Sequence, residues 1–350
     1  MDIKDYFTYW DWAVLFGYLL LTTWVGHLMR GKQGTIRDFF LGGRSLPWPA
    51  VTGSMIATEI SGVTFIGVPA TLFALNGDFT YLQWAIGSIG ARFLVAFFFV
   101  RAYYEKEIYS PYDFIGQRLG AFGKQLTTFL FIIGGILGQS VRVMVAALPL
   151  MIVTGIEFHW CILIIGIFAI AWTLMGGMQT VIWTDVMQFF LFLFGGGLAL
   201  FWIVNSLPGG WGEMMEIGGQ FDRTTFFNFE FGWGPEFHFT FWVAVIAVPF
   251  QNLAMFGVDQ LNAQRMFCCK DEASAKKALI FSSFGQIITL MMLFVGLALF
   301  AYYHNQGGWT AAEAAIVKPG EVMVGSVPIP GTGDAVFPMW IVTNLPVGIR

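Results

Sequence analysis

Long apolar runs separated by short polar segments dominate the sequence. A transmembrane helix needs about 20 mostly apolar residues, and eight runs of that kind can be placed. They are expected at 10–29, 46–76, 79–101, 124–155, 158–175, 178–205, 238–263 and 277–303. The pattern predicts an all-α polytopic membrane protein. The polar stretches 206–237 and 304–337 are expected to hold short surface helices or lids.

Composition agrees with that class. The chain is 57% hydrophobic and 11% charged, against about 25% charged in soluble domains, so the lipid bilayer is an expected partner. A net charge of −4 without a basic cluster excludes a nucleic-acid partner. The three cysteines are an odd number, and Cys268 and Cys269 lie in a Lys-rich loop. Free thiols are therefore expected rather than a disulfide framework.

Lysine and arginine concentrate in alternate loops, which sets the orientation because cytoplasmic loops are rich in them. The loops after the first, third and seventh helices carry Arg30, Lys32, Arg37, Arg44, Arg101, Lys106, Arg118, Lys124, Arg265, Lys270, Lys276 and Lys277. The opposite side carries Lys4, Arg223 and Lys318. The N-terminus is therefore predicted to lie outside.

Glu59 is the charged residue of an otherwise uncharged stretch, 46–76. A charge near the centre of a bilayer costs about 2.5–3.5 kcal/mol on insertion scales, so it indicates a functional site. Small and hydroxylic neighbours favour a broken helix whose carbonyls face a polar ligand; they are Gly53, Thr58, Ser61, Gly62, Thr64 and Gly67. The alternative is a continuous helix in which Glu59 pairs with an arginine of a neighbouring helix.

Polar residues also interrupt the span 238–263, at Pro249, Gln251, Asn252, Gly257, Asp259 and Gln260. Two interrupted helices five spans apart are typical of an inverted-repeat transporter with a site at mid-membrane. The single transporter domain, 1–350, would then comprise an extra helix at 10–29, a first repeat at 46–205 and the start of a second at 238–350.

Asp185 begins the sixth predicted span, near Thr180 and Thr184. A carboxylate there suits a hard cation such as sodium. The alternative is capping, because an acid in the first helical turn is stabilised by the helix dipole.

Two arginines lie within predicted spans. Arg142, beside Gln139 and Ser140, is expected to be buried halfway along its helix, where it would pair with Glu59 or grip an anionic ligand bidentately. The ligand role is favoured because polar side chains are expected at the same depth. Arg92 is expected nearer the cytoplasm, where it can snorkel.

Enzyme motifs are missing: the chain has no HExxH, Walker-type or CxxC motif, and its four histidines are scattered. A membrane enzyme is therefore not expected, nor is a cofactor other than a coupling ion.

At four motifs the chain resembles the sodium/solute symporter family, which has a LeuT-type five-helix inverted repeat with one extra N-terminal helix. The motifs are DFFLGGRSLPWPAVTGSMIATEISGVTFIG (38–67), SPYDFIGQRLG (110–120), GGMQTVIWTD (176–185) and FGVDQLNAQRMFCCKDEASAKKA (256–278). The resemblance implies symport of a small organic solute with Na⁺. It also implies sodium ligation by the backbone carbonyls of Ala57 and Ile60, completed by hydroxyls beyond Arg350.

The resemblance further places Asp185 near the sodium path. Glu59 would bind sodium or pair with Arg142. Substrate-binding residues fall on Ser61, Thr64, Gln83, Arg142, Asn252, Phe256 and Gln286. Arg142 resembles the carboxylate-binding arginine of sialic-acid transporters, which favours a carboxylate-bearing solute; sugars, polyols and amino acids remain open.

The apolar run 336–350 stops abruptly, so the chain is expected to be truncated within the second repeat. Some symporter-like modules are fused to histidine-kinase regions, so a sensor remains the alternative function. The protein is expected in the plasma membrane, which in a bacterium is the inner membrane.

Overall fold

The computed structural model describes residues 8–31, 34–74, 76–106, 108–234, 237–306, 321–324, 327–330 and 336–348. These residues are mainly helical. The longer helices are α1 (Tyr9–Leu28), α3 (Trp48–Glu59), α5 (Trp84–Glu105), α6 (Pro111–Thr154), α7 (Phe158–Ser206), α8 (Gly210–Gln220), α11 (Glu272–Phe281) and α12 (Gly285–Asn305). Shorter helices are α2 (Ile36–Leu41), α4 (Val68–Phe73), α9 (Val248–Leu253), α10 (Gln260–Phe267) and α14 (Val336–Asn344).

Single turns of 3₁₀ or π helix join several of these helices. The 3₁₀ turns are η2 (Gly42–Arg44), η4 (Phe79–Gln83) and η8 (Ser282–Phe284). The π turns are η3 (Val63–Gly67), η6 (Val243–Ala247) and η7 (Ala254–Val258). Two strands, β1 (Glu321–Val324) and β2 (Val327–Pro330), pair antiparallel with Val322 opposite Ile329.

In the described part of the chain, four helical segments are long and apolar enough to cross a membrane, or six if each of two bent pairs is one span. The four are Phe79–Glu105, Pro111–Met151, Phe158–Ser206 and Glu272–Asn305. The bent pairs are Trp48–Glu59 with Val63–Phe73, at 58°, and Val243–Val258 with Gln260–Phe267, at 53°. Both interruptions fall within the spans in which the sequence predicted them.

Glycine explains where the longest helix divides. At a rise of 1.5 Å per residue, the 49 residues of α7 would extend about 74 Å, well beyond a hydrocarbon core of about 30 Å. Gly176 and Gly177 leave the helical conformation, and Gly177 has a φ of 57°. The interruption lies at the predicted boundary between spans 158–175 and 178–205. The prediction for 10–29 is met by a helix, α1, but that helix is not among the spans that are apolar enough to cross.

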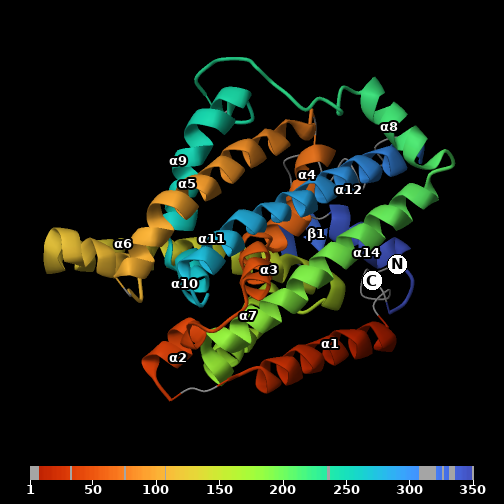
Figure 1. Cartoon of the computed structure of the whole chain (residues 1–350). Coiled ribbons are helices and arrows are strands. Elements are labelled where there is room, and N and C mark those ends of the chain that lie inside the picture. Colours follow the sequence, from red (N-terminus) through yellow and green to blue (C-terminus); the bar gives the residue numbers. More distant parts are fainter. Residues whose placement is uncertain are drawn as a thin grey trace.

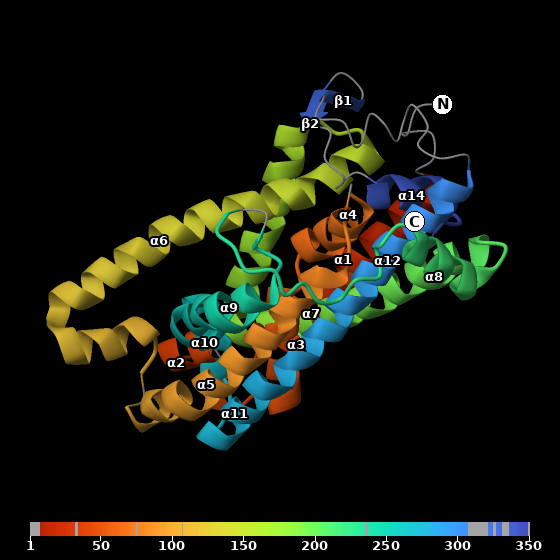
Figure 2. The same cartoon turned by 90° about the horizontal axis from the view of Figure 1, so that it is seen from above.

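The broken helix α3 lies at the centre of the molecule (Figures 1 and 2), in contact with α7 and α11, while α12 packs on α4 and α7. The second broken helix packs on α5 through α9. Helix α6 extends beyond the other helices in both views. This arrangement brings α5, α12 and both interrupted helices around one small region, which contains most of the predicted site residues.

The expected start of one helix needs correction. Helix α6 starts at Pro111, not near residue 124, because the polar segment SPYDFIGQRLG is itself helical: Ser110 caps it and Pro111 occupies its first turn. Gly120, with φ 80° and ψ 179°, separates that segment from the apolar part. The stretch 206–237 contains the expected short helix, α8; most of 304–337 lies outside the described residues. Cys161, Cys268 and Cys269 are free thiols, as predicted.

Candidate functional site

The first helix break exposes backbone carbonyls. Helix α3 ends at Glu59, and Ile60 follows with φ −78° and ψ 103°, an extended conformation. Among the described residues, no backbone N–H donates to the carbonyls of Ala57 or Ile60. Ser61 continues the non-helical backbone, and the helix resumes at Gly62, whose φ of −51° and ψ of −32° are helical. The break therefore leaves two carbonyl oxygens available to a hard cation, which prefers oxygen ligands.

Glu59 pairs with Arg92, not with Arg142. A terminal guanidinium nitrogen of Arg92 contacts Glu59 Oε2, and Gln286 Nε2 donates to Glu59 Oε1 at 3.0 Å. The Glu59 side chain is 15% exposed and Arg92 is fully buried. The prediction that Arg92 snorkels is wrong, because its donors are all directed into the protein. The break and the ion pair, which the sequence presented as alternatives, are both present.

Arg92 has further partners from several elements. Its Nε donates to Ser282 Oγ at 3.0 Å, a terminal nitrogen donates to Ser88 Oγ at 2.6 Å, and its Cζ lies 4.1 Å from the centre of the Phe256 ring. Such a position over an aromatic face stabilises a guanidinium. Ser88 in turn donates to Asn252 Oδ1 at 3.3 Å. Arg92 is thus the centre of a buried polar cluster.

The cluster contains four predicted site residues, Glu59, Asn252, Phe256 and Gln286. The sequence did not identify its centre. One signal was available: Ser88 and Arg92 are four residues apart and so share a face of the helix. A polar pair on one face of an otherwise apolar span suggests an inward orientation. What the sequence does not give is the identity of the neighbouring helix on that side.

The other predicted substrate residues are in different surroundings. Ser61 and Thr64 are partly exposed at the first break. Gln83, in contrast, is held by backbone groups of the segment after α8: its amide donates to the Phe239 carbonyl at 3.0 Å and accepts from Asn228 N–H at 3.3 Å. Gln83 therefore anchors that segment.

Arg142 reaches the same break from the other side. It is partly buried, and one of its terminal nitrogens lies 3.3 Å from the Thr58 carbonyl oxygen. The expectation that Arg142 is buried is met only in part, because the residue keeps some exposure; Gln139 and Ser140 beside it are exposed. Within the described residues, Arg142 forms no salt bridge. Its guanidinium can therefore accept an anionic group without first giving up an internal carboxylate.

Asp185 lies in an ion pair rather than at a helix end. It is two turns beyond the Gly177 interruption, and Arg265 of α10 donates to its Oδ2 at 3.0 Å. Ser54 of α3 donates to the same oxygen at 2.5 Å. Thr180 and Thr184 instead bond to backbone carbonyls. First-turn capping is thus excluded, and Asp185 joins α7 to both interrupted helices.

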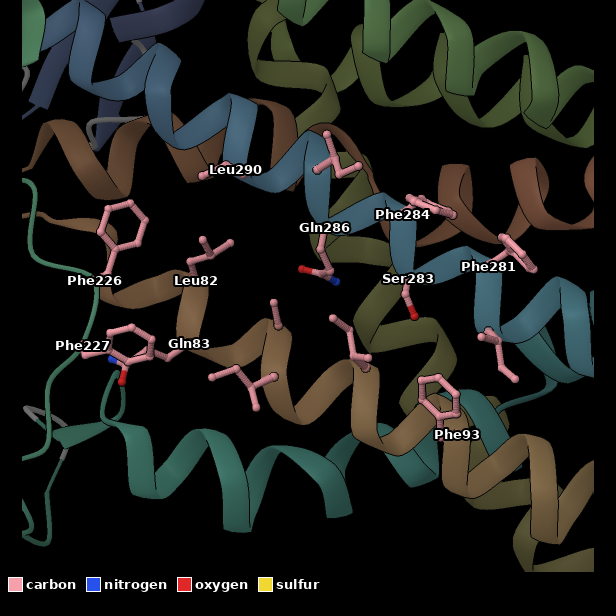
Figure 3. A pocket seen from close by; sticks show the side chains of 15 residues that line it. Leu82, Gln83, Phe93, Phe226, Phe227, Phe281, Ser283, Phe284, Gln286 and Leu290 are labelled. Carbon is pink, nitrogen blue, oxygen red and sulfur yellow. The ribbon is translucent and has the colours of Figure 1, made fainter.

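An apolar cavity of about 650 Å³ lies beside this cluster, between α5 and the α11–α12 segment (Figure 3). Phe226 and Phe227 close one end, and Phe93 lies at the other. Two predicted site residues, Gln83 and Gln286, contribute to its wall. Glu59, Asn252 and Phe256 are not part of the lining. The cavity therefore adjoins the polar cluster and is lined mainly by apolar side chains.

Within the described residues, no group of three or more His, Cys, Asp or Glu side chains could hold a metal ion. The carbonyls of Ala57 and Ile60 are the oxygen ligands that the structure offers at the first break. Na⁺ is a weakly held hard cation, for which such carbonyl oxygens are suitable.

Two interrupted helices beside a buried charge cluster are typical of the inverted-repeat transporter architecture. The sequence profile of the Sodium:solute symporter family matches residues 39–324. The chain belongs to this family, whose members are transporters and not enzymes.

Individual relatives agree with this assignment. A sodium-coupled monocarboxylate transporter 2 from Bos taurus is 28% identical over 92% of this chain and 52% of its own length. A sodium/glucose cotransporter from Vibrio parahaemolyticus is 27% identical over 93% of this chain and 60% of its own length. The solved structure of a substrate-bound, outward-open Na⁺-coupled sialic acid symporter superimposes with a TM-score of 0.85, at 27% identity, over 98% of this chain and 68% of that one. The chain spans about half the length of the curated monocarboxylate transporter.

Proposed function

We propose that the protein carries out sodium-coupled symport of a small organic solute by alternating access. The observation that supports this most directly is the first helix break. There, the carbonyls of Ala57 and Ile60 receive no backbone N–H among the described residues, next to the carboxylate of Glu59. Free carbonyls at a helix break are the groups with which transporters of this architecture coordinate a coupling ion. Glu59 adds negative charge to the same place.

We further propose that the solute carries a carboxylate. Arg142 supports this class, since its guanidinium lies at the Thr58 carbonyl and forms no salt bridge within the described residues. A planar guanidinium binds a carboxylate through two parallel hydrogen bonds. The monocarboxylate and sialic acid transporters among the relatives are named for acids, whereas the glucose cotransporter is named for a sugar.

Uptake by cells expressing the complete gene tests the proposal. Radiolabelled lactate, sialic acid, glucose and proline would be offered separately in sodium and in choline buffers. The expected result is uptake of a carboxylate probe that is lost when choline replaces sodium. Uptake that persists unchanged in choline would disprove sodium coupling. Sodium-dependent uptake of glucose alone would leave coupling intact and disprove the carboxylate class.

A matched control compares Arg142 of α6 with Arg101 of α5. Arg142→Lys should lower carboxylate uptake, because an ammonium cannot reproduce the bidentate geometry. Arg101→Lys should have no effect, since Arg101 is exposed and pairs only locally with Glu105 at 2.7 Å.

A further inference from the structure

The Arg92 guanidinium has partners at both helix breaks. Glu59 is the last residue of α3, immediately before the first break. Phe256, whose ring lies under the guanidinium, belongs to η7 and is three residues before Asp259, where the second break occurs. Asn252, in α9, is joined to Arg92 through Ser88. One side chain thus contacts both interrupted helices.

The α11–α12 segment closes this arrangement. Ser282 accepts from Arg92 Nε at 3.0 Å, and Gln286 donates to Glu59 at 3.0 Å. Figure 3 shows Gln286 projecting from α12 toward the space beside α5. Because all these groups are buried or nearly so, a shift of Glu59 cannot be absorbed by water. It must be accommodated by Arg92 and therefore by the groups that Arg92 contacts.

The geometry at the first break makes such a shift consequential. Glu59 is adjacent in sequence to Ile60 and two residues from Ala57, whose carbonyls form the proposed sodium half-site. A cation held by these oxygens attracts the Glu59 carboxylate, which Arg92 also attracts. The position of Glu59, and with it the position of Arg92 over Phe256, then depends on whether the cation is bound.

We propose that Arg92 is a positioning residue that transmits sodium occupation of the first helix break to the second helix break. This inference rests on the proposed sodium coupling and names the side chain that carries it. Coupling between two sites requires an element that both sites bias. Here that element is the guanidinium held between Glu59 and Phe256.

The test follows the second break while sodium alone is varied. Ala254 is exposed at the start of η7, so Ala254→Cys provides a reporter thiol in the complete protein. Its labelling rate by a maleimide would be measured in sodium and in choline, with no solute present. The native Cys161, Cys268 and Cys269 are buried and should contribute little. In the parent, sodium is expected to change the labelling rate by at least about fivefold, the lower end of typical coupling.

Two variants then remove the connection in different ways. Arg92→Lys keeps the charge but cannot reach Ser282, Ser88 and Glu59 together. The double variant Glu59→Gln, Arg92→Gln removes both charges, so that it avoids the unmatched buried charge of either single variant. In both, the sodium response at Ala254→Cys is expected to fall to within about twofold of no change. Arg101→Gln, nine residues further along α5, should keep the parent response.

The outcomes separate coupling from a purely structural role. If the pair only stabilises the fold, the double variant should recover both membrane abundance and the sodium response, which would overturn the proposal. A parent response in Arg92→Lys would also overturn it; if the double variant does not reach the membrane, this measurement decides. Uptake by the same cells is measured in sodium and in choline. If uptake does not require sodium, sodium coupling itself has failed. If uptake requires sodium but the labelling of the parent does not respond to sodium, only the role of Arg92 is refuted.

Discussion

The two helix breaks have similar geometry and different chemistry. Both broken spans bend by more than 50°, and in both a π turn precedes a Val-Pro pair, Val68–Pro69 or Val248–Pro249. Proline lacks an N–H and so disrupts the hydrogen bonding of the preceding turn, which favours the wider π turn. The first break is surrounded by the charged side chains of Glu59, Arg92 and Arg142. The second break is held by hydrogen bonds of its own helix and by the uncharged Tyr103 of α5, whose hydroxyl donates to the Gly257 carbonyl at 2.8 Å.

Local hydrogen bonds stabilise the second break as well. The Asp259 side chain accepts from Leu261 N–H at 2.7 Å and caps α10, and Asn262 Nδ2 donates to the Met255 carbonyl at 3.1 Å. At the first break, the charged partners come from α5 and α6. The comparison teaches that a bent span does not by itself identify a binding site. The break that we propose to be functional is the one at which charged side chains of other helices meet.

Neutralising one acid at each break should produce the largest difference. Glu59→Gln leaves Arg92 buried without a counter-charge and should lower the free energy of unfolding by about 3–5 kcal/mol. Asp259→Asn should cost less than about 1 kcal/mol, because Asn also caps helices well. Denaturant unfolding in detergent micelles, followed by circular dichroism, measures both. Equal losses would show that the two breaks do not differ as described.

Next in size is the effect of Arg142→Lys on solute binding. Losing one of two hydrogen bonds between charged groups should weaken solute binding by about 1.5–3 kcal/mol, or about 10- to 150-fold. Stability should stay unchanged, because Arg142 forms no salt bridge within the described residues. The KM for the transported carboxylate and the unfolding midpoint would be measured together. A lowered midpoint with an unchanged KM would assign Arg142 a structural role.

Much of this comparison could be predicted from the sequence. Hydropathy located the spans, and the small residues around Glu59 located the first break. The sequence could not determine which arginine meets Glu59. Hydropathy places a residue along the membrane normal but does not say which side of its helix the residue is on. Arg142 was expected at mid-helix and Arg92 nearer the cytoplasm, yet Arg92 is the partner of Glu59. The partners of Gln83 were hidden for a related reason: they are backbone groups at 228 and 239, which carry no residue-specific signal.

A smaller effect is expected where Asp185 of α7 meets the first broken helix. Asp185→Asn removes a negative charge while keeping the side-chain shape. At an effective dielectric constant of about 20, a charge about 10 Å away contributes about 1–2 kcal/mol. The sodium concentration for half-maximal uptake should therefore rise about 5- to 30-fold. The control is Asp113→Asn, whose carboxylate pairs with Lys124 at the partly exposed start of α6. If both variants have the same sodium dependence, Asp185 serves only to bind Arg265.

The gentlest test asks whether the two broken helices cross the membrane in opposite directions, as an inverted repeat requires. The distribution of Lys and Arg predicts that the segment before α3 is cytoplasmic and the segment before α9 is external. Arg37→Cys places an exposed thiol on the segment before α3, and Gln220→Cys places one on the segment before α9. Little packing is lost at either site. The native background is low, because burial raises the pKa of Cys269 to about 12 and raises that of Cys268 well above its usual range. These thiols therefore remain protonated and unreactive near neutral pH. An impermeant maleimide applied to intact cells should label Gln220→Cys and leave Arg37→Cys unlabelled until the membrane is opened. Labelling of Arg37→Cys from outside would reverse the orientation of the first break and, with it, the side from which sodium reaches Ala57 and Ile60.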